Sequence, residues 1–311
     1  MRGKQNELMV IRENASLLAD ANFTPIIEPV KSAISGLKRA LDEVRLANGR
    51  AVVIVNPHHG ELANDDEETI GALVGDYEDA DGIQLGILLT QQVTLEEVTA
   101  LLEKYDGEQL VFVHSGFGNA KSLAACLGDD NIAGVKHVFI EKHCGKLYQK
   151  RFDDAYKVLI RDGFDKRKNS EYPDYESFSD IHLTYELEGA DAFGDFLIVG
   201  DEFSESGGPA YAVAIHITCI DEDNEDEIWI HHFKSDRNDS PQDPAGKFAE
   251  AVDKLVEELD ELETHITETR AMESFRDLHA RSHFPGLGVV KKLSMQHHIE
   301  MLAEYFDSID D

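Results

Sequence analysis

A strand followed by a helix, repeated along the first half of the chain, is the feature that most constrains the fold. Short runs rich in β-branched residues recur, and each ends on a polar residue before a helical pattern begins. Runs that are apolar almost throughout are typical of strands buried on both faces of a parallel sheet. Six such runs occupy residues 24–28, 51–56, 85–90, 110–114, 137–141 and 157–162.

Two folds are built from consecutive strand–helix units, namely a (β/α) barrel and an open doubly wound sheet. Six consecutive units without a clear reversal of the chain favour the barrel. Helices are predicted between the runs. One covers residues 36–48, and Thr94 and Glu97 form a capping box that opens another.

The pattern changes after Asp162. A helical segment is predicted around residues 177–187, and strand-like runs follow at 196–201, 212–218 and 227–233. Only turn-like residues separate these runs, so neighbouring strands are predicted to pair antiparallel. Asp243 and Pro244 then suit the start of a helix, the first of three.

The fold class predicted from these patterns is α/β. We expect an irregular TIM-like (β/α) barrel in residues 1–242, with a β-meander near its closing strands. Residues 243–311 are expected to form a helical C-terminal extension packed on the same domain.

The net charge and the cysteines limit the classes of function that this chain can have. The formal net charge of −33 repels nucleic-acid phosphates and anionic membranes, so we expect no direct binding to nucleic acid and no membrane association. No apolar run is long enough to span a bilayer or to serve as a signal peptide, which leads us to expect a cytoplasmic protein. The three cysteines have unrelated spacings, so reduced thiols are expected.

Polar residues at strand ends are the predicted site, because ligands of parallel α/β folds bind beyond the carboxyl ends of the strands. Carboxylates and histidines serve acid–base chemistry and bind hard metals, so a divalent metal is a candidate cofactor. The predicted catalytic set is Glu28, His114, Asp162 and Asp201. The predicted ligand contacts at the same end of the barrel are Asn56, Glu141, Arg161, His216 and Lys234. The alternative is that strand ends face solvent and are polar for that reason.

The loop after the fourth run is the sharpest local feature. Gly116 and Gly118 follow a strand and lead into a helix that carries Lys121. Backbone N–H groups and a helix N-terminus in this setting can bind phosphate, and these three residues are the predicted phosphate contacts. The loop lacks the spacing of a P-loop or a dinucleotide fingerprint, so an ordinary tight turn is the alternative.

Histidine pairs and clustered cations are weaker signals. Adjacent histidines on a strand or helix point in different directions and rarely chelate one metal together. Residues 284–294 read as a glycine-bearing loop that leads through Lys291 and Lys292 into a helix, and a second cationic group lies at residues 161–168. Either group could hold an anionic ligand or an acidic partner, or could be solvated charge.

Several tracts resemble the phage and bacterial "beta protein" family and its uncharacterised bacterial relatives. These tracts are residues 2–8 with 25–29, residues 193–201 with 212–216 and 229–231, and residues 284–288 with 291–298. The resemblance implies a barrel-like α/β body and a setting in mobile elements or phage defence beside a partner gene. It carries over no catalytic residue.

Two functions follow as predictions. The first is a barrel-type protein, in the manner of a hydrolase or a binder, that holds a phosphate-bearing small molecule or nucleotide at the strand ends. The second is a non-catalytic component of a two-protein assembly, of a phage-defence or toxin–antitoxin-like kind, whose partner is encoded by a neighbouring gene. Whether the chain is an enzyme stays open at this point.

Overall fold

The computed structural model describes residues 1–63, 67–77, 80–205 and 208–310. The chain divides into two compact units. Unit 1 is Met1–Asp162 with Ile181–Asp195, and unit 2 is Gly163–Asp180 with Phe196–Asp311. Neither unit is continuous in sequence, because the chain passes from one to the other at three points.

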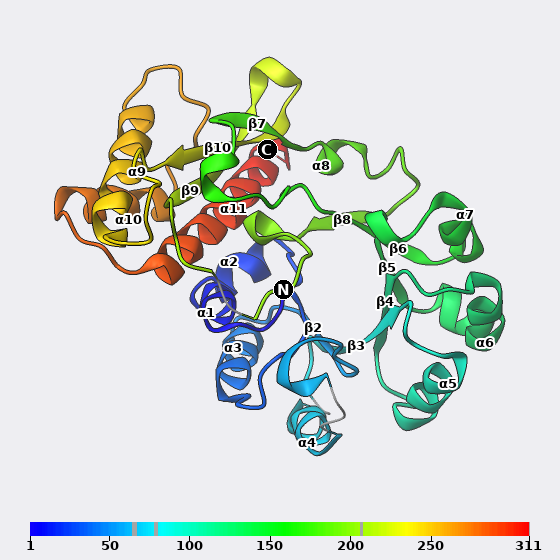
Figure 1. The fold of residues 1–311 in the computed structure, drawn as a ribbon. Helices are drawn as coiled ribbons and strands as arrows, with labels where there is room; N and C mark the ends of the chain where they lie inside the picture. Colours follow the sequence, from blue (N-terminus) through cyan, green and yellow to red (C-terminus); the bar gives the residue numbers. More distant parts are fainter. Residues whose placement is uncertain (64–66, 78–79, 206–207, 311) are drawn as a thin grey trace. The chain divides into compact units, whose positions relative to one another are not determined.

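Unit 1 is built on a seven-stranded parallel sheet in the order β1-β2-β3-β4-β5-β6-β8. The strands are β1 (Ile26–Ile27), β2 (Ala51–Ile54), β3 (Ile83–Thr90), β4 (Leu110–Ser115), β5 (Lys136–Ile140), β6 (Tyr156–Arg161) and β8 (Ala192–Asp195). The sheet curls into a half-barrel with helices on its outer face (Figure 1). The helices of unit 1 are α1 (Gln5–Glu13), α2 (Ala15–Asp20), α3 (Ser35–Leu46), α4 (Glu67–Tyr77), α5 (Leu95–Lys104), α6 (Ala120–Ala133), α7 (Lys146–Gln149) and α8 (Ile181–Thr184), with 3-10 turns η1 (Gly60–Leu62), η2 (Glu141–His143) and η3 (Lys150–Phe152).

The strand–helix repeat is confirmed by this sheet, and the apolar runs account for it. Alternate residues such as Phe112 and Phe139 face the helices and join Val98 and Leu123 in one core cluster. Intervening residues such as Val113 are buried on the opposite face. Strands of this kind suit a parallel sheet, whose two faces are both covered.

Gly86 in β3 shows how closely the strands pack. A Cβ atom at this position would lie 2.7 Å from the Ile54 side chain and 2.8 Å from that of Val52, both in β2. Real Cβ atoms do not approach other carbons so closely, and glycine is therefore required here unless β2 shifts.

The predicted irregular TIM-like barrel is confirmed only in part, because the sheet does not close. The sheet is open, with β1 and β8 as its edges in the described residues. The chain leaves unit 1 after Asp162 and returns only for α8 and the short β8. Residues 163–180 therefore add no strand to this sheet, and the sheet stops at half a barrel.

Unit 2 pairs a small antiparallel sheet with helices. Its strands are β7 (Tyr175–Ser179), β9 (Ala214–Asp221) and β10 (Glu227–Lys234), in the order β7-β10-β9. The predicted antiparallel pairing is confirmed for β9 and β10, which pair from Ala214 with Lys234 to Asp221 with Glu227. The 3-10 turns η4 (Asn169–Glu171), η5 (Leu197–Val199) and η6 (Glu222–Asn224) complete this part of the unit.

Two predicted elements of this region differ in the structure. Residues 177–179, expected at the start of a helix, belong to strand β7, and Tyr175 of β7 stacks on Trp229 of β10. Residues 196–201, expected as a strand, contain the 3-10 turn η5 instead, and Leu197 within it and Gly200 just after it have positive φ angles. The positive φ of Leu197 lies outside the β region.

The three predicted C-terminal helices are present as α9 (Pro244–Leu259), α10 (Arg270–Ala280) and α11 (Leu287–Asp310). Asp243 caps α9, because its carboxylate accepts the N–H of Gly246 with Pro244 in the first turn. The helices share one core cluster with β9, whose members include Ile215, Ile217 and Phe248. The compact unit therefore joins the meander to the helices, and its boundaries differ from the predicted one between residues 242 and 243.

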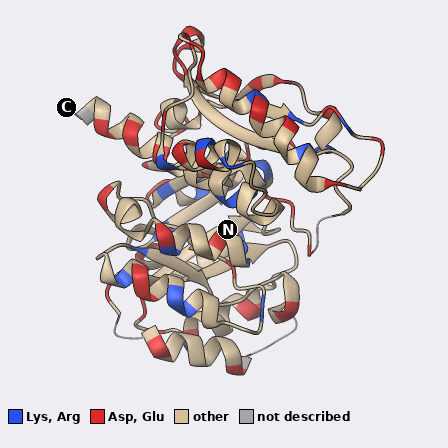
Figure 2. Ribbon diagram, turned by 90° about the vertical axis from the view of Figure 1, so that its left-hand side faces the viewer, with Lys and Arg blue, Asp and Glu red and all other residues tan. Residues whose placement is uncertain are grey.

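Acidic residues are spread over the helices and loops of both units (Figure 2). Among the described residues, no helix combines the length and the apolar character needed to cross a membrane.

Candidate functional site

Glu28, at the end of β1, is held inside unit 1 by a full set of hydrogen bonds. Its carboxylate accepts the backbone N–H groups of His58 and His59 at 2.7 and 3.0 Å, and Arg2 Nη1 donates to it at 2.9 Å. His59 Nδ1 lies 2.9 Å away. Burial raises the pKa of Glu28, but the bond from His59 and the charge of Arg2 outweigh burial and hold the pKa below its usual value. This carboxylate anchors the residue 58–59 turn beside β1.

His114 faces the helix layer, on the same side of β4 as Phe112. Its Nδ1 lies 2.8 Å from Tyr148 Oη and its Nε2 lies 2.8 Å from His137 Nδ1. His137 Nε2 in turn lies 3.1 Å from the Asn131 carbonyl. His114 is fully buried, and burial holds its pKa well below the usual value. Both ring nitrogens are used within the core, so His114 acts as a neutral packing residue.

Other predicted strand-end residues also have partners within the fold. The Asn56 amide extends the sheet, because it donates to the Leu88 carbonyl at 2.9 Å and accepts the Leu88 N–H at 2.8 Å. Arg161 and Glu141 lie together at the ends of β6 and β5, joined by two bonds of 2.6 and 3.0 Å.

The remaining predicted catalytic residues belong to different units. Asp162 follows β6 in unit 1, and Asp201 follows η5 in unit 2. In unit 2, Lys234 pairs with Asp174 at 2.9 Å, and His216 faces His232 across β9 and β10. The twelve predicted site residues thus occupy several separate settings.

The β4–α6 loop has the turn that its sequence predicts. Gly116 has a φ of 91°, a conformation that glycine adopts without strain. Asn119 caps α6, since its side-chain carbonyl accepts the Ser122 N–H at 3.0 Å. One backbone N–H that a phosphate could use is therefore already bonded, and the helix N-terminus alone does not make a phosphate cradle.

A basic segment surrounds this loop in an otherwise acidic chain. Residues 114–151 contain six lysines and arginines against three aspartates and glutamates, a net charge of +3 in a chain of −33. Four exposed cations of this segment form no ion pair within the described residues, namely Lys121, Lys142, Lys150 and Arg151. By contrast, Lys166, Arg167 and Lys168 of the second cationic group all pair with carboxylates.

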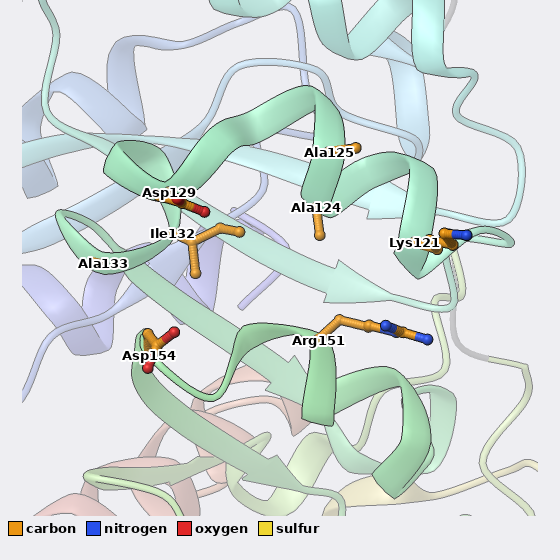
Figure 3. Close-up of a pocket in the computed structure, with 8 residues that line it drawn as sticks. All are labelled: Lys121, Ala124, Ala125, Asp129, Ile132, Ala133, Arg151 and Asp154. Atoms are coloured by element: carbon orange, nitrogen blue, oxygen red, sulfur yellow. The ribbon is translucent and has the colours of Figure 1, made fainter.

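Two of these unpaired cations line a surface groove between α6 and η3. The groove has a volume of about 520 Å³. Lys121 and Arg151 lie at one end and Asp129 and Asp154 at the other, with Ala124 and Ile132 between them (Figure 3). The kink of α6 at Gly128, where φ is 72°, precedes the acidic end. The groove therefore offers a cationic end, an apolar floor and a carboxylate end to one small molecule.

Sequence reasoning identified Lys121 but missed Arg151, Asp129 and Asp154. Arg151 belongs to no motif, and it reaches the groove only because η3 packs beside α6. The available signal was compositional, since a basic segment within so acidic a chain can be found by counting charges along the sequence.

One described group has the geometry of a metal site. The ligand atoms of Asp221, Asp223 and His265 lie within 4.8 Å of one another. Asp221, however, already accepts hydrogen bonds from Tyr175 Oη at 2.6 Å and from the N–H groups of Asp223 and Asn224. Its orientation is explained by the turn that it caps.

No family model, curated protein or solved structure matches the chain. The resemblance to the "beta protein" family, and the partner gene that it implies, stay predictions.

Proposed function

We propose that the chain binds a phosphorylated sugar or a nucleotide in the groove between α6 and η3. The observation that carries this proposal is the convergence of Lys121 and Arg151 on one groove, without carboxylate partners among the described residues. An acidic chain that leaves two neighbouring cations unpaired has a local field that attracts anions against the sign of its net charge.

The rest of the groove favours a ligand with hydroxyl groups as well as phosphate. Arginine and lysine bind phosphate by charge-assisted hydrogen bonds. Asp129 and Asp154 can accept hydrogen bonds from sugar hydroxyls at the opposite end, and Ala124 and Ile132 provide apolar contact between the two ends. A volume near 520 Å³ lies within the usual range for small-molecule sites.

Isothermal titration calorimetry with AMP, ribose 5-phosphate, adenosine and inorganic phosphate tests the proposal. AMP and ribose 5-phosphate should bind, and adenosine should bind much more weakly. A hydrogen bond to a charged group contributes about 1.5–3 kcal/mol, so Lys121→Ala and Arg151→Ala should each weaken AMP binding about tenfold or more.

Lys168→Ala is the matched control, because Lys168 is an exposed lysine of unit 2 that pairs with Glu171. Its affinity for AMP should equal that of the wild type. Binding of AMP that is unchanged in the Lys121→Ala, Arg151→Ala double variant would place the ligand elsewhere. Absence of binding by all four compounds at millimolar concentration would exclude this function.

A further inference from the structure

A chain of polar side chains crosses one face of the unit 2 sheet and ends at His216. His216 Nδ1 lies 2.7 Å from His232 Nδ1, and His232 Nε2 lies 3.1 Å from Glu176 Oε1. Arg167 Nη1 donates to both oxygens of Glu176 at 2.7 and 3.0 Å. The order is therefore guanidinium, carboxylate, imidazole, imidazole.

The hydrogen bonds fix the tautomer of each ring. The Glu176 carboxylate, paired with Arg167, can only accept, so His232 Nε2 carries the proton. Burial lowers the pKa of His232 to about 4 despite Glu176, so this ring is neutral near pH 7 and its Nδ1 has a lone pair. His216 must then donate from Nδ1, which leaves the lone pair of His216 on Nε2.

His216 Nε2 is the open end of this hydrogen-bonded row of side chains. Within the described residues it has no hydrogen-bond partner, and the residue is half-buried. Phe164 and Tyr172 contact the ring edge-on, with centroids at 5.1 and 4.8 Å, and hold it in place. Tyr172 also stacks on His232 at 4.5 Å. Burial lowers the pKa of His216, and the charges of His232 and of Lys291 on α11 lower it further.

We propose that His216 is a proton acceptor in a second site of this protein, one that acts on water or on a hydroxyl group of a ligand. The proton leaves the O–H group and binds His216 Nε2, while the Nδ1 proton moves to His232 Nδ1. His216 is then again neutral, and the positive charge is on His232, next to the Glu176 carboxylate. No oxidant or reductant is required, and the proposal is independent of the groove in unit 1.

The relay gives the two histidines and the carboxylate behind them a joint role. An isolated imidazole in this setting would gain a proton only at the cost of a buried charge. Transfer to His232 places that charge 3.1 Å from Glu176. A carboxylate behind a histidine commonly fixes its tautomer and raises its basicity, and His232 here extends that effect by one ring.

Site-resolved labelling with diethyl pyrocarbonate tests the proposal on the full chain. The Nε2 lone pair attacks a carbonyl carbon of the reagent and displaces ethyl carbonate, so labelling requires an accessible and unprotonated nitrogen. Peptide mass spectrometry at pH 7 should show rapid labelling of His216. His232→Phe and Glu176→Gln should each slow the labelling of His216 about tenfold, because the proton is then no longer held on His216 Nδ1 and can occupy Nε2, the nitrogen that must attack the reagent.

The exposed His283 in the same digests is the internal control, and its rate should not change in either variant. Near-UV circular dichroism checks that the variants keep the packing of unit 2. Failure of His216 to label in the wild type, or an equal His216 rate in the wild type and in both variants, would overturn the proposal.

Discussion

His297 on α11 makes the stability of unit 2 depend on pH. The residue is fully buried, with Nε2 2.7 Å from the Thr218 carbonyl and Nδ1 2.9 Å from Thr269 Oγ1. The carbonyl can only accept, so Nε2 carries the proton, and Nδ1 accepts from the Thr269 hydroxyl. The neutral ring is therefore satisfied at both nitrogens, and burial lowers the pKa of His297 to about 4.

The direction of the effect follows from this lowered pKa. The unfolded chain gives a histidine pKa of about 6.5, so below that pH the unfolded state binds a proton that the folded state does not. The free energy of unfolding thus falls as the pH falls from about 6.5 toward 4. Between pH 7 and pH 5 the contribution of His297 is a loss of about 2 kcal/mol.

Urea unfolding at pH 7 and pH 5 measures this loss, followed by the fluorescence of Trp229, the single tryptophan, which lies in unit 2. His297→Gln removes the titrating group, and His283→Gln is the control at an exposed position. Each protein is compared with itself at the two pH values, so any loss of stability in the variant at pH 7 cancels. The wild type and the His283→Gln control should lose about 2 kcal/mol more than His297→Gln on acidification. An equal loss in all three proteins would refute the assignment of a buried neutral imidazole.

Three further changes test the packing of unit 1 by urea unfolding. Gly86→Val should destabilise it by about 1–3 kcal/mol, because the new side chain collides with Ile54 in β2; unchanged stability would mean that β2 moves aside. Glu28→Ala should cost about 3–5 kcal/mol, since Arg2 then lacks its carboxylate, and a cost below about 1 kcal/mol would contradict the buried pair. Thr94→Ala should cost about 1 kcal/mol through loss of the capping box, and Thr94→Ser should restore most of it.

The sequence predicts the parts of the fold that depend on short-range patterns of apolar residues, such as the strands of the parallel sheet. Residues 85–90 and 110–114 form strands as expected, because an apolar run between turns has few other ways to bury itself. Closure of the sheet depends instead on where residues 163–180 pack, and no short-range pattern encodes that. The strand predicted at residues 196–201 fails for a related reason, since an apolar run can also be buried as a 3-10 turn.

The sequence does not show which strand-end residues lie together, because side chains alternate between the two faces of a strand. His114 stands two residues after Phe112, so it shares the helix-facing side of β4 and not the polar end. The His216–His232 contact could have been predicted from the hairpin. Once residues 222–226 are read as its turn, the register sets His216 opposite His232.

The three crossings between the units have a consequence for synthesis on the ribosome. Residues 1–162 contain six of the seven strands of the large sheet, but β8, the neighbour of β6, is encoded only at residues 192–195. When β6 has left the ribosome, about thirty more residues must therefore be synthesised before β8 can pair with it, and one side of β6 is unpaired until then. Unpaired edges recruit other strands. A fragment that ends near residue 162 should aggregate, whereas one that ends just beyond residue 195 has every strand of the sheet.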